Sequence, residues 1–209
     1  MKRVVLLVEG YTEIRFVKDV LAPYLSIDIL LKPISSGGSI KYDKFRKELL
    51  NLLYDRKNYD TVTTMQDLYK IGKDFPCYDE AQLIRNPYQK VDFLEKALTE
   101  DISRDNFIPN LQLHEFETLL FCDKIGFHNH YSKHAELKEI DNIITRYPNP
   151  ELINEHYETA PSRRIAKIFG ERGYKKYLDG ILIARQIGIE VMLEKCTHFR
   201  TWVEKLKEY

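Results

Sequence analysis

The sequence predicts an α/β protein in which a mostly parallel, four-stranded sheet is flanked by helices and followed by a helical C-terminal half. Short segments rich in apolar and β-branched residues alternate with segments whose apolar residues recur at helical spacing, a pattern typical of βαβ units. The run from Val4 to Val8 is apolar throughout, as in a strand buried on both faces. From Glu115 onward the pattern is helical, and no further strand is expected.

Each predicted strand is a short run rich in Val, Ile, Leu or Thr. Thr12 is the expected N-cap of the first helix, and Pro23 should kink or stop that helix near its end. The stretch from Asp67 to Lys90 has no clear period, and a loop of this length is more often functional than accidental. The four strands are expected at residues 4–8, 27–31, 59–65 and 107–113, with helices between them at residues 14–24, 45–53 and 91–98.

The second half of the chain reads as a series of short helices. Thr159 to Ser162 predicts a helix start, with Pro161 in the first turn. We expect an α/β domain at residues 1–122 and a helical extension at residues 123–209 that packs on the sheet, the two forming one compact unit.

The charge balance argues against a dedicated nucleic-acid-binding protein. The chain has 209 residues, and its 32 basic and 32 acidic side chains give a formal net charge of zero. Tight binding to nucleic acid regardless of sequence usually requires a basic excess, so positive contacts must come from local patches. The three cysteines lack zinc-ligand spacing and predict buried free thiols better than disulfides.

No segment predicts membrane attachment or export. The apolar run that ends at Val8 is followed at once by Glu9 and Gly10, so it is too short for the apolar region of a signal peptide. No stretch approaches the length of a membrane span. The expected location is the cytoplasm.

Acidic side chains follow three of the four predicted strands. Glu9 ends the first strand, Asp67 follows the third, and Glu115 and Glu117 follow the fourth. Ligands of open parallel sheets bind outside the carboxyl ends of the strands. Like charges gathered there repel each other, and a divalent cation is the common remedy. Because oxygen ligands favour Mg²⁺ or Mn²⁺ over zinc, we predict a magnesium or manganese site around Glu9 and Asp67.

Each carboxylate also has a structural interpretation. Glu9 would be stabilised near the N-terminus of the following helix, and an isolated Asp such as Asp67 usually serves a turn or a cap. On a helix, Glu115 and Glu117 would point to different sides, so one of them would simply face solvent. The convergence of the four residues favours the metal site for Glu9 and Asp67 and leaves both interpretations open for the other two.

The motif Leu7-Val8-Glu9-Gly10-Tyr11-Thr12-Glu13 resembles the opening motif of Toprim domains, which occur in topoisomerases, primases and nucleases of overcoming-lysogenization-defect type. The resemblance implies a Toprim-like α/β domain in which Glu9 is a general acid/base or a metal ligand. In such domains an Asp-x-Asp motif after a later strand binds the metal.

Most of the chain is similar to one bacterial branch, a Toprim-like family of unknown function. Members of that family sit beside ABC-type ATPases in anti-phage defence systems, and one branch supplies the effector nuclease of the phage anti-restriction-induced system. The resemblance implies a hydrolase that cleaves tRNA or DNA, with an ABC-type ATPase and a second copy of the chain as candidate partners. It is carried by residues 6–16, 63–69, 107–109, 113–117 and 158–162.

One departure from the Toprim pattern concerns the metal ligands. Where a Toprim domain has two aspartates, this chain reads Met65-Gln66-Asp67, so the first is missing. Glu115 or Glu117 could replace it, because the fourth strand should end close by. Glu13, in the first turn after Gly10, is a further candidate ligand.

For a nuclease, Mg²⁺ held by Glu9 and Asp67 would polarise a phosphoryl oxygen and neutralise the leaving oxygen. His114 is a candidate for proton transfer, although a lone His is more often structural. Gly37 and Gly38 could offer backbone N–H groups to a phosphate, although Gly-Gly is more often just a turn. A basic cluster on the helix after Pro161 is either a phosphate-binding patch or a solvated face; it contains Arg163, Arg164 and Lys167, with Lys175 and Lys176 beyond it.

Two other functions remain open at this point. A non-catalytic or partner-gated binding subunit of an ABC-type ATPase complex is favoured by charge neutrality and the missing aspartate, and opposed by the retained Glu9, Gly10 and Asp67. Nucleotidyl transfer of primase type would use the same ions, but the sequence gives no sign of a nucleotide pocket.

Overall fold

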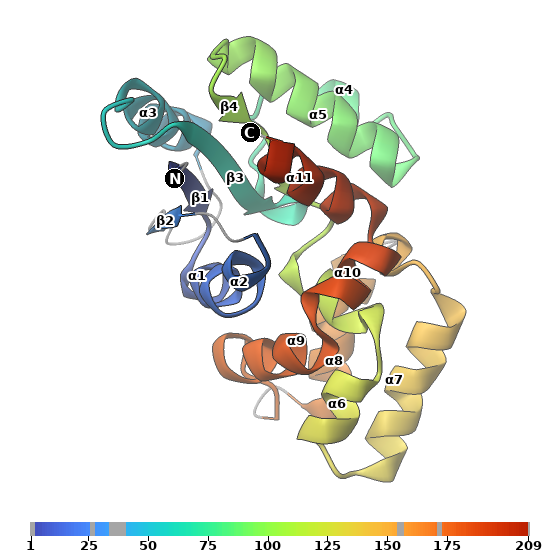
Figure 1. Cartoon of the computed structure of the whole chain (residues 1–209). Coiled ribbons are helices and arrows are strands. Elements are labelled where there is room, and N and C mark those ends of the chain that lie inside the picture. The colour runs from blue at the N-terminus through green and yellow to red at the C-terminus, as the bar shows by residue number, and fades with distance from the viewer. Residues whose placement is uncertain (1–2, 26–27, 34–40, 154–156, 171–172, 209) are drawn as a thin grey trace.

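The computed structural model describes residues 3–25, 28–33, 41–153, 157–170 and 173–208, and it confirms the predicted α/β architecture with a helical C-terminal half (Figure 1). The strands pair in parallel in the order β2-β1-β3-β4, and β5 extends the pairing along β3. All four predicted strand positions are occupied. The strands are β1 (Arg3–Val8), β2 (Asp28–Pro33), β3 (Thr61–Asp67), β4 (Phe107–Ile108) and β5 (Leu111–Gln112).

The helices of the first half are α1 (Tyr11–Phe16), η1 (Val17–Leu21), α2 (Ala22–Leu25), α3 (Tyr42–Tyr54), η2 (Leu68–Lys70), α4 (Tyr78–Ala81) and α5 (Pro87–Ile102). Those of the second half are η3 (Phe116–Cys122), α6 (Ile125–His130), α7 (His134–Arg146), η4 (Pro150–Leu152), η5 (Tyr157–Thr159), α8 (Pro161–Phe169), η6 (Lys176–Gly180), α9 (Ile181–Ile187), α10 (Ile189–Lys195) and α11 (Thr197–Glu208). The helix start predicted at Pro161 is confirmed, with Ala160 as its N-cap.

The sheet separates two hydrophobic cores, because successive side chains of a strand point to opposite faces. Val5 and Leu7 face a core shared with α3 and α5. Val4, Leu6 and Val8 face a larger core that includes α1 and most of the C-terminal helices. The helical half therefore packs on one face of the sheet, and α11 lies beside β3 (Figure 1), where Trp202 Nε1 donates to Thr63 Oγ1 at 2.8 Å.

The first helix differs from its prediction at both ends. Gly10, in extended conformation, is the N-cap, and Thr12 lies inside the helix as a buried residue, so the predicted Thr12 cap is wrong. The helix continues past Pro23 to Leu25 through the π-type turn η1. Proline has no N–H to donate to the carbonyl four residues back, and the wider turn before Pro23 accommodates that loss without ending the helix.

The fourth strand position is filled by two short segments, because Pro109 and Asn110 interrupt the ladder between β4 and β5. Asn110 replaces the missing pairing with hydrogen bonds to Thr64. Its backbone N–H donates to Thr64 Oγ1 at 3.0 Å, and its side-chain amide donates to the Thr64 carbonyl at 3.2 Å. The chain therefore stays against β3 as far as the residues that precede Glu115.

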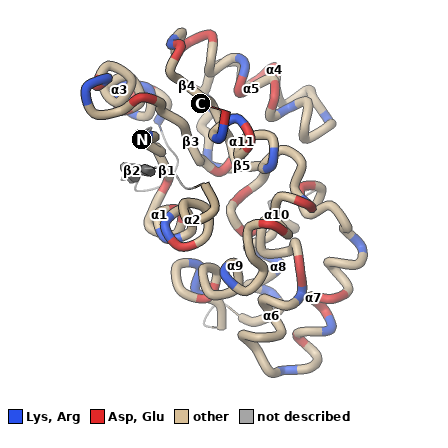
Figure 2. Tube along the Cα trace, in the orientation of Figure 1, with Lys and Arg blue, Asp and Glu red and all other residues tan. Residues whose placement is uncertain are grey.

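Within the described residues, no helix is long and apolar enough to cross a membrane. Cys122 and Cys196 are buried free thiols with their sulfur atoms 3.4 Å apart, as the sequence predicted, whereas Cys77 is exposed. Basic and acidic residues are interspersed along the chain trace (Figure 2).

Candidate metal and phosphate site

Three carboxylates from three separate elements surround the ammonium group of Lys176. The Lys176 Nζ lies 3.2 Å from Glu13 Oε1, 3.4 Å from Asp67 Oδ2 and 3.3 Å from Glu117 Oε2. Glu13 comes from the first turn of α1, Asp67 is the last residue of β3, and Glu117 lies in the first turn of η3. The fold thus gathers these acidic groups at the carboxyl end of β3, as parallel topology predicts.

The three carboxylates are almost inaccessible to solvent: the side chains of Glu13, Asp67 and Glu117 are 4%, 2% and 1% exposed. Burial raises the pKa of Asp67 well above its ordinary value, opposed by Lys176 and reinforced by Glu13, Glu9 and Glu117. Burial likewise raises the pKa of Glu117 to about 6. These shifts are the expected response of acids crowded together out of water, and a divalent cation bound to the three carboxylates would oppose them more strongly than the single charge of Lys176 does.

Lys176 has the opposite electrostatic environment. Burial lowers its pKa, but attraction to the surrounding carboxylates, led by Asp67 and Glu117, outweighs that effect and raises the pKa well above its ordinary value. Lys176 is therefore a full positive charge at neutral pH. In the sequence Lys176 stands only as part of a basic run, which gives no signal of its place in the acidic cluster.

Glu9 lies next to this cluster with its side chain 16% exposed. Its Oε1 pairs with Lys70 Nζ at 3.2 Å. Its Oε2 is buried without a hydrogen-bond partner in the described part of the chain, and so are Glu13 Oε1 and Glu117 Oε2, despite the ion-pair distance of the latter two from Lys176. Buried carboxylate oxygens without directed donors are costly, and an all-oxygen set of this kind fits a hard divalent cation such as Mg²⁺ or Mn²⁺.

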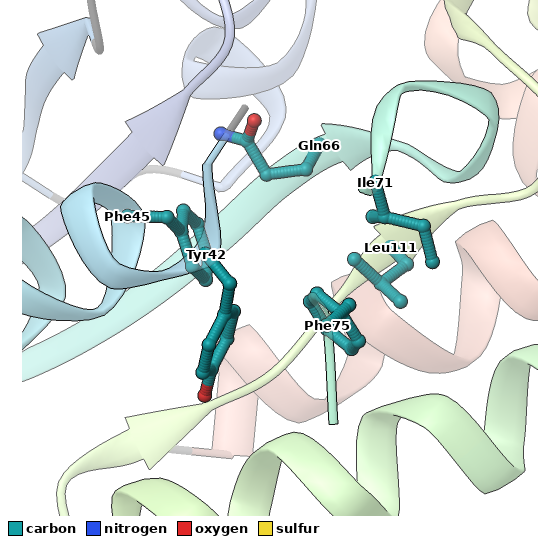
Figure 3. Close-up of a pocket in the computed structure, with 6 residues that line it drawn as sticks. All are labelled: Tyr42, Phe45, Gln66, Ile71, Phe75 and Leu111. Carbon is teal, nitrogen blue, oxygen red and sulfur yellow. The ribbon is translucent and has the colours of Figure 1, made fainter. Parts of the chain in front are cut away.

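Neither Met65, at the position of the missing aspartate, nor the neighbouring Gln66 can supply a metal ligand to the cluster. Met65 is 1% exposed and belongs to the larger hydrophobic core. Gln66 points to the opposite face of the sheet, where its Nε2 donates to the Leu7 carbonyl at 3.1 Å. It lines a small apolar pocket there (Figure 3), away from the acidic cluster, together with Tyr42, Phe45, Ile71, Phe75 and Leu111. Glu13 and Glu117 supply the additional carboxylates beside Asp67.

Glu115 takes a different role from Glu117. Its two carboxylate oxygens accept hydrogen bonds from the backbone N–H and the hydroxyl of Ser162, at the first turn of α8. A carboxylate there satisfies an otherwise free N–H group and interacts favourably with the helix dipole. The structure thus separates the two glutamates: Glu117 faces the Lys176 cluster, and Glu115 holds the start of α8.

His114 is held by hydrogen bonds on both ring nitrogens. Nε2 lies 2.8 Å from the Glu151 carbonyl oxygen, and Nδ1 lies 3.3 Å from the Tyr69 hydroxyl. Burial lowers the pKa of His114 to about 4, so the ring is neutral at physiological pH. Its φ of 63° is in the left-handed region. These contacts join the end of β5 to η2 and η4, which favours a positioning role over proton transfer.

A pocket of about 500 Å³ opens beside the cluster and carries both signs of charge. Arg163 lines it, whereas Arg164 turns away and donates to the carbonyl oxygens of Thr159 and Ile153. Lys167 is exposed on the same helix, and the Gly37–Gly38 loop lies outside the described residues. The pocket is lined by Asp67, Tyr69, Lys70, Glu115, Glu117, Ala160, Ser162, Arg163, Ala166, Tyr174 and Lys176.

A second group of potential ligands, Asp92, Glu95 and His198, joins α5 to α11. One ligand atom from each lies within 4.8 Å of the others. Glu95 Oε1 already accepts from the Leu111 N–H at 2.8 Å and lies 3.0 Å from His198 Nε2. Burial lowers the pKa of His198, but Glu95, Glu151 and Asp92 together outweigh burial and raise it above the ordinary value. Protonated His198 and Glu95 form an ion pair between the two helices. The spacing of Asp92, Glu95 and His198 in the sequence gives no signal that brings them together.

Comparison with known proteins supports the fold described above. The C-terminal region of the Xanthomonas campestris pv. campestris OLD protein has a similar structure, with a TM-score of 0.50 and 17% sequence identity over 100% of this chain and 95% of that one. This likeness confirms the predicted α/β fold. No curated protein matches the chain. Residues 8–207 match the family model described as a domain of unknown function (DUF4276), and the chain belongs to that family.

Proposed function

We propose that this protein is a nuclease dependent on Mg²⁺ or Mn²⁺ that hydrolyses phosphodiester bonds in DNA or tRNA. The observation that carries the proposal is the convergence of Glu13, Asp67 and Glu117 on one point, with Glu9 beside it and three of their buried oxygens lacking directed donors. The Toprim-like fold and the adjoining charged pocket support it.

The residues divide into three roles in this mechanism. Glu13, Asp67 and Glu117 would hold the divalent cation, which supplies Lewis-acid stabilisation of charge on the phosphoryl oxygens. Glu9 would act as the general acid or base, a role supported by its position beside the cluster, where Lys70 holds its Oε1. Arg163 and Lys70 line the pocket and would position the anionic backbone, which extends the basic patch predicted on α8 toward the acidic site.

An alternative is a non-catalytic or partner-gated subunit of an ABC-type ATPase complex. It is favoured by Lys176, which already supplies a positive charge to the acidic cluster. A defence role, an ATPase partner and a second copy of the chain rest on the family resemblance described from the sequence, and they remain predictions.

Thermal unfolding with and without Mg²⁺ or Mn²⁺ tests the metal site. We expect a cation at ~100 times its Kd to raise Tm by about 5 °C or more. Asp67→Asn should remove this rise, although an asparagine oxygen can still accept from the Phe116 N–H as Asp67 Oδ1 does. Glu115→Gln is the matched control in the same pocket and should keep the rise.

Catalysis is tested by incubating mixed DNA and total tRNA with the purified protein and Mn²⁺, beside Glu9→Gln. Cleavage that the variant lacks would establish the nuclease and identify its substrate class. A metal-induced rise in Tm without cleavage would support the partner-gated alternative, and the absence of any metal effect would exclude the metal-dependent mechanism.

A further inference from the structure

The proposed cation position and the Lys176 ammonium coincide. Lys176 Nζ is within 3.4 Å of one oxygen each from Glu13, Asp67 and Glu117. Mg²⁺ binds its oxygen ligands at about 2.0–2.1 Å. The same three oxygens can therefore approach either the ammonium or the metal ion, and the ammonium must leave when they close on the metal.

The ammonium neutralises the cluster incompletely. Asp67 Oδ2 accepts a hydrogen bond from Nζ, but Glu13 Oε1 and Glu117 Oε2 have ion-pair distances without hydrogen-bond geometry. One positive charge thus faces three buried carboxylates. A divalent cation would neutralise more of this negative charge than the ammonium does, and this difference favours displacement of the lysine.

The lysine side chain has a route out of the cluster. It is 32% exposed, and it lines the pocket shared with Arg163. Its backbone is fixed independently of the ammonium, because the Lys175 N–H donates to Asp179, which also pairs with His130 at 2.9 Å. The flexible stem of Lys176 can therefore swing into the pocket without unfolding η6.

We propose that Lys176 is a built-in competitor for the divalent cation: its ammonium occupies the carboxylate cluster in the metal-free protein, and the cation binds only as Lys176 moves out. This inference rests on the proposed metal site and adds a control on its occupancy. The competition sets a free-cation concentration below which Lys176 keeps the site blocked. A bound phosphate that attracts Lys176 into the pocket would lower that concentration.

Titration of Mn²⁺ by calorimetry tests the proposal without using activity. Lys176→Met keeps a long side chain but removes the charge, and we expect it to bind Mn²⁺ at least about tenfold more tightly than the original chain. Equal or weaker binding by Lys176→Met, beside measurable binding by the original chain, would overturn the competition and leave the metal site standing. Failure of both folded proteins to bind Mn²⁺ would overturn the proposed function as well.

Labelling of lysine amines in the unmodified protein gives a second measurement, in case Lys176→Met does not fold. An ammonium enclosed by three carboxylates is poorly accessible to a labelling reagent, and movement of Lys176 into the pocket exposes it. Mass spectrometry should find Lys176 labelled several-fold faster with Mn²⁺ than without it, while exposed Lys167 on α8 is labelled equally. An unchanged Lys176 rate at a Mn²⁺ concentration that saturates the site would contradict the proposal.

Discussion

Glu115 binds the first turn of α8 through Ser162: one carboxylate oxygen accepts from the Ser162 N–H, and the other accepts from its hydroxyl at 2.9 Å. Two residues further along, Glu117 faces Lys176 instead. The two glutamates therefore make different contacts, and substitutions at each position should have different effects.

Glu115→Ala should destabilise the protein by about 1–3 kcal/mol, because it removes charge-assisted hydrogen bonds and leaves the Ser162 N–H without its acceptor. Urea unfolding measures this loss. Cation-induced stabilisation should persist in Glu115→Ala and disappear in Glu117→Gln. If Glu115→Ala instead loses the cation response at unchanged stability, Glu115 is a ligand and not a cap.

Neighbouring arginines on α8 provide a second contrast. Arg163 lines the charged pocket, whereas Arg164 is engaged with the carbonyl oxygens of Thr159 and Ile153. Arg163→Ala should weaken binding of single-stranded DNA or tRNA and lower the slope of log affinity against log salt by about 1. Arg164→Ala should keep that slope and lose stability instead. Equal slopes for both variants and the original chain would remove Arg163 from the nucleic-acid site.

Much of the fold could be predicted from periodicity. The uninterrupted apolar run at Val4–Val8 and the regular helical spacing around Phe45 depend on local sequence, and both became β1 and α3 as expected. The Thr12 cap failed because tertiary packing buries that side chain and the helix begins two residues earlier, after Gly10. The break at Pro109 and Asn110 depends on hydrogen bonds to Thr64, a residue far away in the sequence.

The candidate site could be predicted only in part, for a related reason. Glu9 and Asp67 follow strands, so parallel topology alone brings them to one edge of the sheet. The separation of Glu115 from Glu117 depends on the 3-10 turn that starts at Phe116, whose N–H donates to Asp67 at 2.9 Å. Lys176 reaches Asp67 from 109 residues further along the chain, and no local pattern encodes that approach.

Gly126 marks a close approach of α6 to α9. A Cβ there would lie 2.7 Å from both the backbone oxygen and Cγ2 of Ile183. Gly to Ala inside a helix usually stabilises by up to about 1 kcal/mol. Gly126→Ala should do the reverse and destabilise by roughly 1–3 kcal/mol, because the backbone of α9 must shift. Denaturant unfolding gives the sign, and a stabilised variant would mean that the two helices are further apart than described.

His114 should make the protein acid-sensitive. Its pKa is lowered by burial from 6.5 to about 4, so between these values the unfolded chain binds a proton that the folded chain rejects. The resulting stability is fully present above about pH 6.5 and is lost as pH falls toward 4, by roughly 3 kcal/mol in all. His114→Asn suits the positive φ and removes the titration. Unfolding free energy should therefore fall less steeply with acid in this variant, and parallel curves would contradict the assignment.

Trp202 and Thr63 join the helical half to the sheet through one hydrogen bond, from Nε1 to Oγ1 at 2.8 Å. Both side chains are buried, at 2% and 0% exposure, so a lone partner would remain unsatisfied. Trp202→Phe should lower the free energy of unfolding by more than the loss of side-chain volume alone would, because Thr63 Oγ1 then has no donor. Thr63→Val alone should cost about 1–2 kcal/mol by leaving Nε1 unpaired.

A double-mutant cycle isolates this interaction from the loss of packing. The combined variant Thr63→Val with Trp202→Phe should be more stable than the sum of the single losses predicts, by about 1 kcal/mol, since neither partner is then left without the other. Additive losses would show that the hydrogen bond contributes nothing. The helical half would in that case be held on the sheet by the core that Val4, Leu6 and Val8 share with the C-terminal helices, together with the contact of Lys176 with Asp67.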